Sequence, residues 1–83
     1  MAEHSSPFTA GPGGVMTDEV GVVTGALELR TTVDEECVLT AWVRYEGADE
    51  WYRVTGGACA LVAPEDHEPV HALLLGVLNR PEG

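Results

Sequence analysis

The sequence HEPVH at residues 67–71 has the spacing of a zinc-protease motif. Residues four apart on a helix point the same way, so two imidazoles can bind one Zn²⁺ while the Glu between them acts as general base. Pro69 argues against this chemistry, because proline lacks an N–H and is tolerated only in a first helical turn. We therefore expect His67 and His71 to border the apolar side of a short helix. Zinc binding by this pair, with a nearby carboxylate or Cys59, remains the alternative.

Nucleophilic catalysis has weak support in the sequence. The only serines, Ser5 and Ser6, lie in a segment rich in helix- and strand-breaking residues, so neither is expected to be anchored. Cys37 and Cys59 fall on the core-facing side of predicted strands, and we expect both to be free, buried thiols. The sequence therefore predicts a protein that is not an enzyme and has no cofactor, with a minimal metallohydrolase as the remote alternative.

A second group of residues lies on the polar side of predicted strands. This group contains both tryptophans, Trp42 and Trp51, and the three arginines Arg30, Arg44 and Arg53. Trp and Arg are the residue types most enriched at the energetic centres of protein interfaces. Arg also binds carboxylate or phosphate through paired hydrogen bonds, and Trp offers a stacking plane. We predict a partner- or ligand-binding face made of these five residues.

The same face has a purely structural interpretation. With the turns expected below, Glu28 would pair with Arg53, and Arg44 would stack on Trp51. Such contacts on a sheet surface contribute roughly 0.2–1 kcal/mol each and need no ligand to explain them. The sequence leaves the structural and the interface interpretations open.

The charge balance limits the partners. The chain has 14 acidic and 4 basic residues, a net charge of −10 and a pI of about 4.3. Phosphate backbones and anionic membranes repel such a chain, so we expect no direct nucleic-acid or membrane binding and favour a protein partner of basic character. The chain contains no Lys, Ile or Gln. That bias is typical of a GC-rich genome and offers a compositional explanation of the acidity.

Two absences guide the expected location. The N-terminal residues contain no apolar core of a secretory signal, and no run of about 18 apolar residues is present. We therefore expect a cytoplasmic protein whose thiols stay reduced.

Alternating apolar and polar residues predict the strands. Leu27, Leu29, Thr31 and Val33 share one side of the first run, and three turns separate the runs that follow. The turn residues are Asp34-Glu35-Glu36, Glu46-Gly47-Ala48-Asp49 and Gly56-Gly57. We predict an antiparallel meander of about four strands over residues 26–33, 37–45, 51–55 and 58–62.

The last segment has a helical period. Its apolar residues follow the i, i+3, i+4, i+7 spacing that buries one stripe of a helix. These residues are Val70, Leu73, Leu74, Val77 and Leu78. Asn79, Arg80 and Pro81 end the pattern, so we predict a helix over residues 66–79 packed on one face of the sheet.

These elements define an α+β fold. We expect residues 1–16 to be a flexible tail and residues 17–83 to form a single small domain, with residues 17–25 either an extended lead-in or a fifth strand. The leading functional hypothesis is a non-catalytic interaction module, such as a regulator, inhibitor or accessory subunit. Open sheet edges also favour a homodimer. The alternative hypothesis is a small-molecule or metal-binding protein that uses the Trp and Arg residues or the His67/His71 pair.

Overall fold

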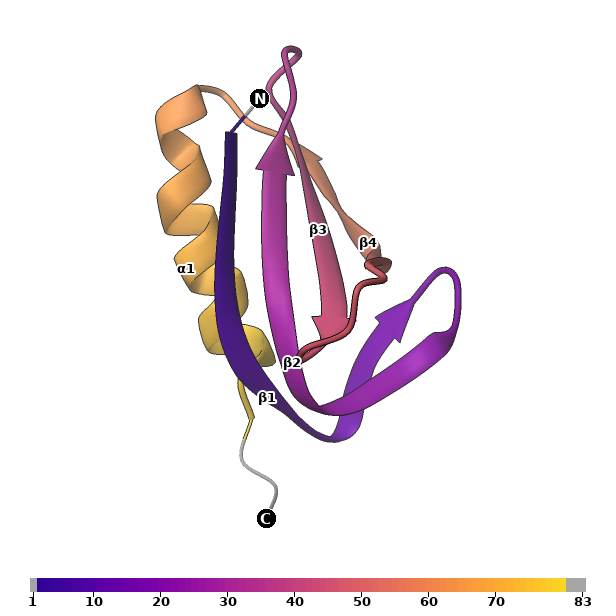
Figure 1. Ribbon diagram of the computed structural model, residues 1–83. Coiled ribbons are helices and arrows are strands. Elements are labelled where there is room, and N and C mark those ends of the chain that lie inside the picture. Colours follow the sequence, from indigo (N-terminus) through magenta and orange to yellow (C-terminus); the bar gives the residue numbers. More distant parts are fainter. Residues whose placement is uncertain (1, 81–83) are drawn as a thin grey trace.

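The computed structural model describes residues 2–80 as four antiparallel strands followed by one helix (Figure 1). The elements are β1 (Ala2–Thr17), β2 (Gly21–Val33), β3 (Val38–Tyr45), β4 (Tyr52–Ala60), the 3₁₀ turn η1 (Pro64–Asp66) and α1 (His67–Leu78). The predicted α+β fold, an antiparallel meander with one C-terminal helix, is confirmed. Residues 1 and 81–83, which the predicted tail, domain and helix stop include, lie outside the described residues.

The sheet is strongly curled. Each strand pairs with the next one along the chain, and the end of β1 reaches β4, where Thr17 pairs with Val54. The backbone N–H of Asp18 also donates to the carbonyl of Arg53 at 3.0 Å. This contact closes the strands into a small barrel at one end. Among residues 2–80, no strand pairs with the same edge of β4 after Val54.

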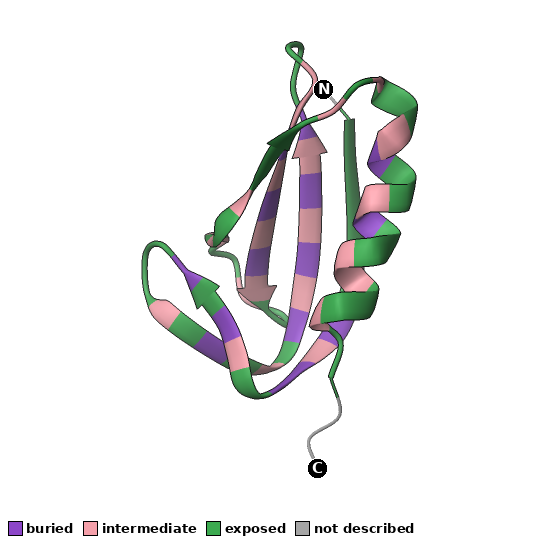
Figure 2. Ribbon diagram, turned by 180° about the vertical axis from the view of Figure 1, so that it is seen from behind, coloured by how far each residue is buried: buried purple, intermediate pink, exposed green. Residues whose placement is uncertain are grey.

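The interior of the curl holds the core. Residues 27–33 of β2 and 38–44 of β3 alternate between buried and half-buried, which is visible as alternating bands in Figure 2. The buried cluster consists of Phe8, Ala10, Val15, Val23, Leu27, Leu29, Ala41 and Val43. The predicted inward face of β2 is therefore confirmed, and Leu39, Ala41 and Val43 of β3 are buried in the same way.

The N-terminal segment corrects the sequence prediction. Residues 2–17 form β1 instead of a flexible tail, and Phe8 and Ala10 contribute to the core. The Gly- and Pro-rich residues 11–14 form a bulge, because Ala10 pairs with Gly25 whereas Val15 pairs with Val23. These breaker residues bend a long hairpin instead of ending the fold. Residues 21–25, whose role the sequence left open, extend β2.

The predicted Gly56-Gly57 hairpin is wrong. Residues 52–60 form the single strand β4, and the residues between Arg53 and Ala58 stand opposite Ala41 alone. Gly56 has φ 72°, and a Cβ at Gly57 would lie 3.1 Å from the Cβ of Ala41. The two glycines therefore form a bulge within one strand instead of a turn between two.

The helix forms where the sequence predicts it but buries a different face. His67 and His71 are buried, and Leu74, Leu75 and Leu78 pack against the core. Leu73 and Val77, expected in the buried stripe, are 66% and 51% exposed. Hydrogen bonds between the two histidines and the sheet, described below, account for this rotation.

The two cysteines are free, as predicted, but they are not buried. Cys37 is half-buried and Cys59 is exposed. Cys59 does stand opposite buried Leu39, on the inner side of the sheet. It is exposed because α1 packs mainly on β1 and β2 and leaves the end of β4 uncovered (Figures 1 and 2).

Candidate functional site

The structure brings the five predicted Trp and Arg residues together on the outer side of the sheet. Arg30 on β2 stands opposite Trp42 on β3, which in turn stands opposite Arg53 on β4. Arg44 lies two residues further along β3, and Trp51 directly precedes β4. We call these five residues the Trp–Arg face.

Both indole rings of this face are stacked by guanidinium groups. The guanidinium carbons of Arg30 and Arg44 lie 4.3 Å and 4.6 Å from the ring centroid of Trp51. That of Arg53 lies 5.1 Å from the ring of Trp42. These distances are within the range of cation–π attraction. The Trp42 Nε1–H also donates to the Thr32 hydroxyl at 3.2 Å, so this ring has a hydrogen bond as well as a stacked guanidinium to hold it.

Arg44 is the best anchored arginine of the face. Its Nε and Nη2 atoms lie 2.7 Å and 2.6 Å from one carboxylate oxygen of Glu28, and its Nη1 donates to the Ala48 carbonyl at 3.0 Å. The expected pairing of Glu28 with Arg53 is therefore wrong, whereas the stacking of Arg44 on Trp51 is confirmed.

The error in the Glu28 pairing comes from the turn between β2 and β3. The Asp34 carboxylate accepts hydrogen bonds from the backbone N–H groups of Glu36 and Val38, and Cys37 adopts φ 64°. The turn thus extends beyond the three acidic residues, and Val33 pairs with Leu39. The register moves by two residues, which keeps every side chain on its predicted face but changes its neighbour.

Arg53 and Arg30 are less occupied by contacts within the chain than Arg44, so they can donate more hydrogen bonds to an external partner. Arg53 is exposed and makes no ion pair within residues 2–80. Arg30 Nη1 approaches the carboxylate of Glu3 only to 3.8 Å, whereas its Nε is buried out of reach of an external partner, so the terminal nitrogens are the donors that Arg30 offers. Unused donors on a stacked, ordered guanidinium are suited to carboxylate or carbonyl oxygens.

The two motif histidines belong to α1 and face the opposite side of the sheet. The Thr31 hydroxyl oxygen is 2.8 Å from His67 Nε2 and 2.7 Å from His71 Nδ1. A hydroxyl has one hydrogen, so Thr31 donates to one imidazole and accepts an N–H from the other. These contacts fix the start of α1 to the C-terminal part of β2.

Ser6 and His4 complete this cluster from β1. The Ser6 hydroxyl lies 2.8 Å from His71 Nε2, so both ring nitrogens of His71 are hydrogen-bonded. The His4 ring centroid lies 4.4 Å from that of His67 and 5.6 Å from that of His71. The sequence placed Ser6 and His4 in a tail, and it missed these contacts because β1 was not recognised.

The surroundings of His67 and His71 disfavour the protonated form of both side chains. Burial lowers the pKa of His67, and the neighbouring His4 lowers it further, against a smaller opposing effect of the Thr31 backbone. Burial likewise lowers the pKa of His71, followed by the charges of His4 and His67. Both imidazoles are therefore expected to be neutral at neutral pH.

The described residues do not assemble a metal centre. No group of three or more His, Cys, Asp or Glu side chains within residues 2–80 is arranged to hold a metal ion. His71 uses both nitrogens on hydroxyl groups, and His67 uses Nε2, which leaves only its buried Nδ1 without a partner. The contacts therefore favour a structural role for the HEPVH sequence over zinc coordination.

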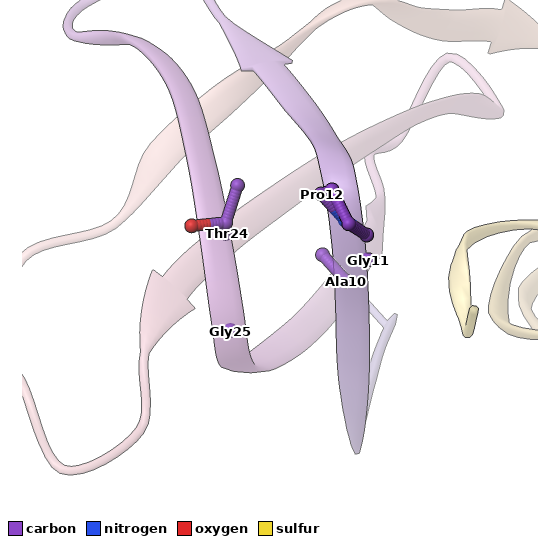
Figure 3. Close-up of a pocket in the computed structure, with 5 residues that line it drawn as sticks. All are labelled: Ala10, Gly11, Pro12, Thr24 and Gly25. Carbon is purple, nitrogen blue, oxygen red and sulfur yellow. The ribbon is translucent and has the colours of Figure 1, made fainter. Parts of the chain in front are cut away.

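A hollow of about 240 Å³ lies at the bend of the β1–β2 hairpin (Figure 3). Its lining residues are Ala10, Gly11, Pro12, Thr24 and Gly25. The hydroxyl of Thr24 is the only polar side-chain group among these five, and no residue of the Trp–Arg face or the histidine cluster borders the hollow. It therefore supplies no acid, base or charged group.

Comparison with known proteins gives no match to a protein-family model, to a curated protein or to a solved structure. Within residues 2–80, no helix has the length and apolar character needed to cross a membrane.

Proposed function

We propose that this chain is a small, acidic, non-catalytic interaction protein that binds a protein partner through its Trp–Arg face. The observation that carries the proposal is the ordered stacking of Arg30, Arg44 and Arg53 on Trp42 and Trp51. Ring and guanidinium planes that are already positioned lose little conformational freedom on binding, which favours affinity. Trp and Arg are also the side chains that dominate interface energetics.

The charges around the face suggest the character of the partner. Exposed Arg53 and weakly paired Arg30 would receive carboxylate or carbonyl oxygens at the centre of the contact. Outside the face the chain is strongly acidic, with a net charge of −10. A partner of basic overall character would therefore be attracted at long range and would present a local acidic or carbonyl-rich spot to the arginines.

A regulator, inhibitor or accessory subunit fits these features, because the chain offers a recognition surface. The Ser6–His71 pair has less support as a catalytic group, because His71 is buried and is oriented by the neutral Thr31 hydroxyl instead of a carboxylate. We propose the cytoplasm as its location, where Cys37 and exposed Cys59 would remain reduced. Nucleic acid is disfavoured as the ligand by the acidity of the chain. Metal binding at His67 and His71 has less support, because their nitrogens are largely occupied within the protein.

Affinity capture with matched variants tests this proposal. Tagged wild-type protein, the double variant Trp42→Ala/Trp51→Ala and the control Tyr45→Ala are used to capture partners from native lysate, and bound proteins are identified by mass spectrometry. Tyr45 is an exposed aromatic residue on the other side of the sheet, so the control removes a ring without touching the face. Circular dichroism establishes that all three proteins are folded.

A stoichiometric partner that binds wild type and Tyr45→Ala but not the double variant supports the proposal. Equal capture by all three proteins places the contact elsewhere, and failure of wild type to capture any protein rejects the interaction function.

A further inference from the structure

A second surface of the molecule is apolar and uncovered. Val70, Leu73, Leu74 and Val77 form a continuous stripe of α1, with the spacing that normally faces a packing partner. Leu73 and Val77 are exposed, and Val70 and Leu74 are only half-buried. The rotation of α1 that buries His67 and His71 leaves Leu74 in contact with the core but turns Leu73 and Val77 toward solvent.

The stripe borders a groove next to the end of β4. The groove has a volume of about 120 Å³ and is lined by Leu39, Gly56, Gly57, Ala58, Cys59, Val70 and Leu74. It therefore lies between α1 and β4, where the barrel is not closed. Within the described residues, the outer edge of β4 has no strand beside it after Val54, so its backbone groups are available for pairing (Figure 2).

This surface differs from the rest of the molecule in charge. Residues 54–64 and 69–79 contain no Asp, Glu, Lys or Arg, in a chain whose net charge is −10. Val62, two residues after the end of β4, is 97% exposed. Past the Gly56-Gly57 bulge, the regular part of the β4 edge at residues 58–60 also lacks the lysines, prolines or inward charges that keep sheet edges apart.

From these observations we propose that the surface is the interface of a homodimer. Two copies pair the free edges of β4 in antiparallel orientation about a two-fold axis, which joins their sheets. The helix stripes of both copies then lie on the same side of the joined sheet and cover each other's grooves. A two-fold axis makes the same patch serve both copies, which requires a patch that is complementary to itself.

The absence of ionised side chains from this surface favours a second copy of the chain as the molecule that covers it. Two chains of net charge −10 repel each other wherever their carboxylates meet, and the surface free of ionised groups avoids this repulsion. A basic partner would gain nothing electrostatically from a neutral patch and would be drawn to the acidic surface instead. An antiparallel strand edge also pairs naturally with its own copy.

The molar mass in solution tests the proposal. Light scattering coupled to size exclusion is expected to give twice the chain mass of 8.8 kDa for wild type. Leu73→Asp is expected to give 8.8 kDa. The matched control Val20→Asp, which places the same charge at an exposed valine of the β1–β2 turn, is expected to remain dimeric. Added salt is expected to tighten the dimer by screening the net charge.

Cross-linking tests the strand pairing separately. In the proposed dimer the Cys59 thiols of the two copies lie close to the symmetry axis. A short bismaleimide is therefore expected to link wild type and Cys37→Ser into covalent dimers and to leave Cys59→Ser unlinked.

The outcomes are distinct from those of the partner capture, because a different surface is altered. A dimer that Leu73→Asp disrupts and Cys59 cross-links supports the proposal. A wild-type mass of 8.8 kDa at every concentration overturns it. A dimer that persists in folded Leu73→Asp, or that does not cross-link through Cys59, also overturns it.

Discussion

The hydroxyl of Thr31 lies 2.7 Å from His71 Nδ1 and 2.8 Å from His67 Nε2, and it thereby joins the C-terminal part of β2 to the first two turns of α1. All three residues are buried. A single polar group thus decides which face of the helix meets the sheet. The HEPVH sequence, which resembles a zinc-binding motif, is used here to orient a helix.

Replacement of Thr31 by valine removes this bridge with almost no change in shape. His67 and His71 then each lose a buried hydrogen bond, and an unsatisfied buried polar group costs about 1–3 kcal/mol. We expect Thr31→Val to lower the free energy of unfolding by an amount in that range or somewhat above it. Urea denaturation followed by circular dichroism measures the change.

Thr40→Val is the matched control for this substitution. Thr40 lies on the outer side of β3 and is half-buried, without a side-chain hydrogen bond among those found in residues 2–80. Its replacement is expected to change stability by less than about 0.5 kcal/mol. Equal effects of the two substitutions would contradict a special role for the Thr31 bridge.

Acidification is expected to loosen the contact between helix and sheet. Burial, followed by the effect of His4, lowers the pKa of His67 and His71 below the ordinary value of 6.5. The unfolded chain therefore takes up protons before the folded chain does, so the stability from these residues is complete above pH 6.5 and declines as pH falls below it. Titration of the imidazole signals by NMR measures both pKa values directly.

His4→Ala isolates one cause of these shifts. His4 is exposed, so its removal should leave the fold intact while it removes the second largest cause of the lowered pKa at both buried histidines. We expect both pKa values to rise toward the ordinary value and the loss of stability in acid to shrink. Titration of His67 and His71 at or above the ordinary histidine pKa in wild type would refute the buried cluster.

Gly14 is expected to tolerate no side chain. It has φ +65°, and an added Cβ would lie 2.5 Å from Val22 Cγ1 and 2.6 Å from the carbonyl oxygen of Val23. The left-handed conformation alone costs roughly 1–2 kcal/mol for a residue with a Cβ. We expect Gly14→Ala to destabilise the protein by about 2 kcal/mol or more in thermal or urea unfolding.

The neighbouring Gly13 provides the comparison. A Cβ there has no atom within 4 Å. Gly13→Ala should therefore change stability by less than about 1 kcal/mol. If both alanine variants unfold alike, the bulge that bends the β1–β2 hairpin is not constrained as the structure indicates.

The sequence predicts which side of the sheet a residue faces more reliably than it predicts which residue lies opposite on the next strand. Alternation places Leu27, Leu29 and Val43 inside and Trp42 and Arg44 outside whatever the register, so the core of β2 and β3 and the composition of the Trp–Arg face were both predictable. The partner of Glu28 was not, because it depends on how far the turn at Asp34 extends.

The errors arose where local signals compete with tertiary packing. Pro7 and residues 11–14 indicate a break, yet β1 forms because its pairing with β2 and the burial of Phe8 outweigh local preference. Gly56 and Gly57 permit either a turn or a bulge, and packing of Gly57 on Ala41 selects the bulge. The burial of His67 and His71 depends on Thr31, more than 30 residues away, and helical periodicity cannot report it.

Within the Trp–Arg face, replacement of Arg44 by alanine is expected to affect stability more, and replacement of Arg53 is expected to affect partner binding more. Arg44 bonds Glu28 and the Ala48 carbonyl and stacks on Trp51, and the Arg44 and Glu28 side chains are less than one-third exposed. We expect Arg44→Ala to lower the free energy of unfolding by about 1–2 kcal/mol. Arg53 is exposed without an ion pair within residues 2–80, so Arg53→Ala should change stability by less than about 0.5 kcal/mol.

For partner binding, we expect Arg53→Ala to have the larger effect and Arg44→Ala the smaller one. Arg53 would donate to the partner itself, and loss of a charge-assisted hydrogen bond at the centre of an interface weakens binding by about 1.5–3 kcal/mol, roughly 10- to 100-fold in Kd. Arg44 already donates within the chain, so Arg44→Ala should weaken partner binding less at temperatures where it is folded. Calorimetric titration of a captured partner against both variants distinguishes them. An unchanged Kd for Arg53→Ala would show that the partner does not use this donor.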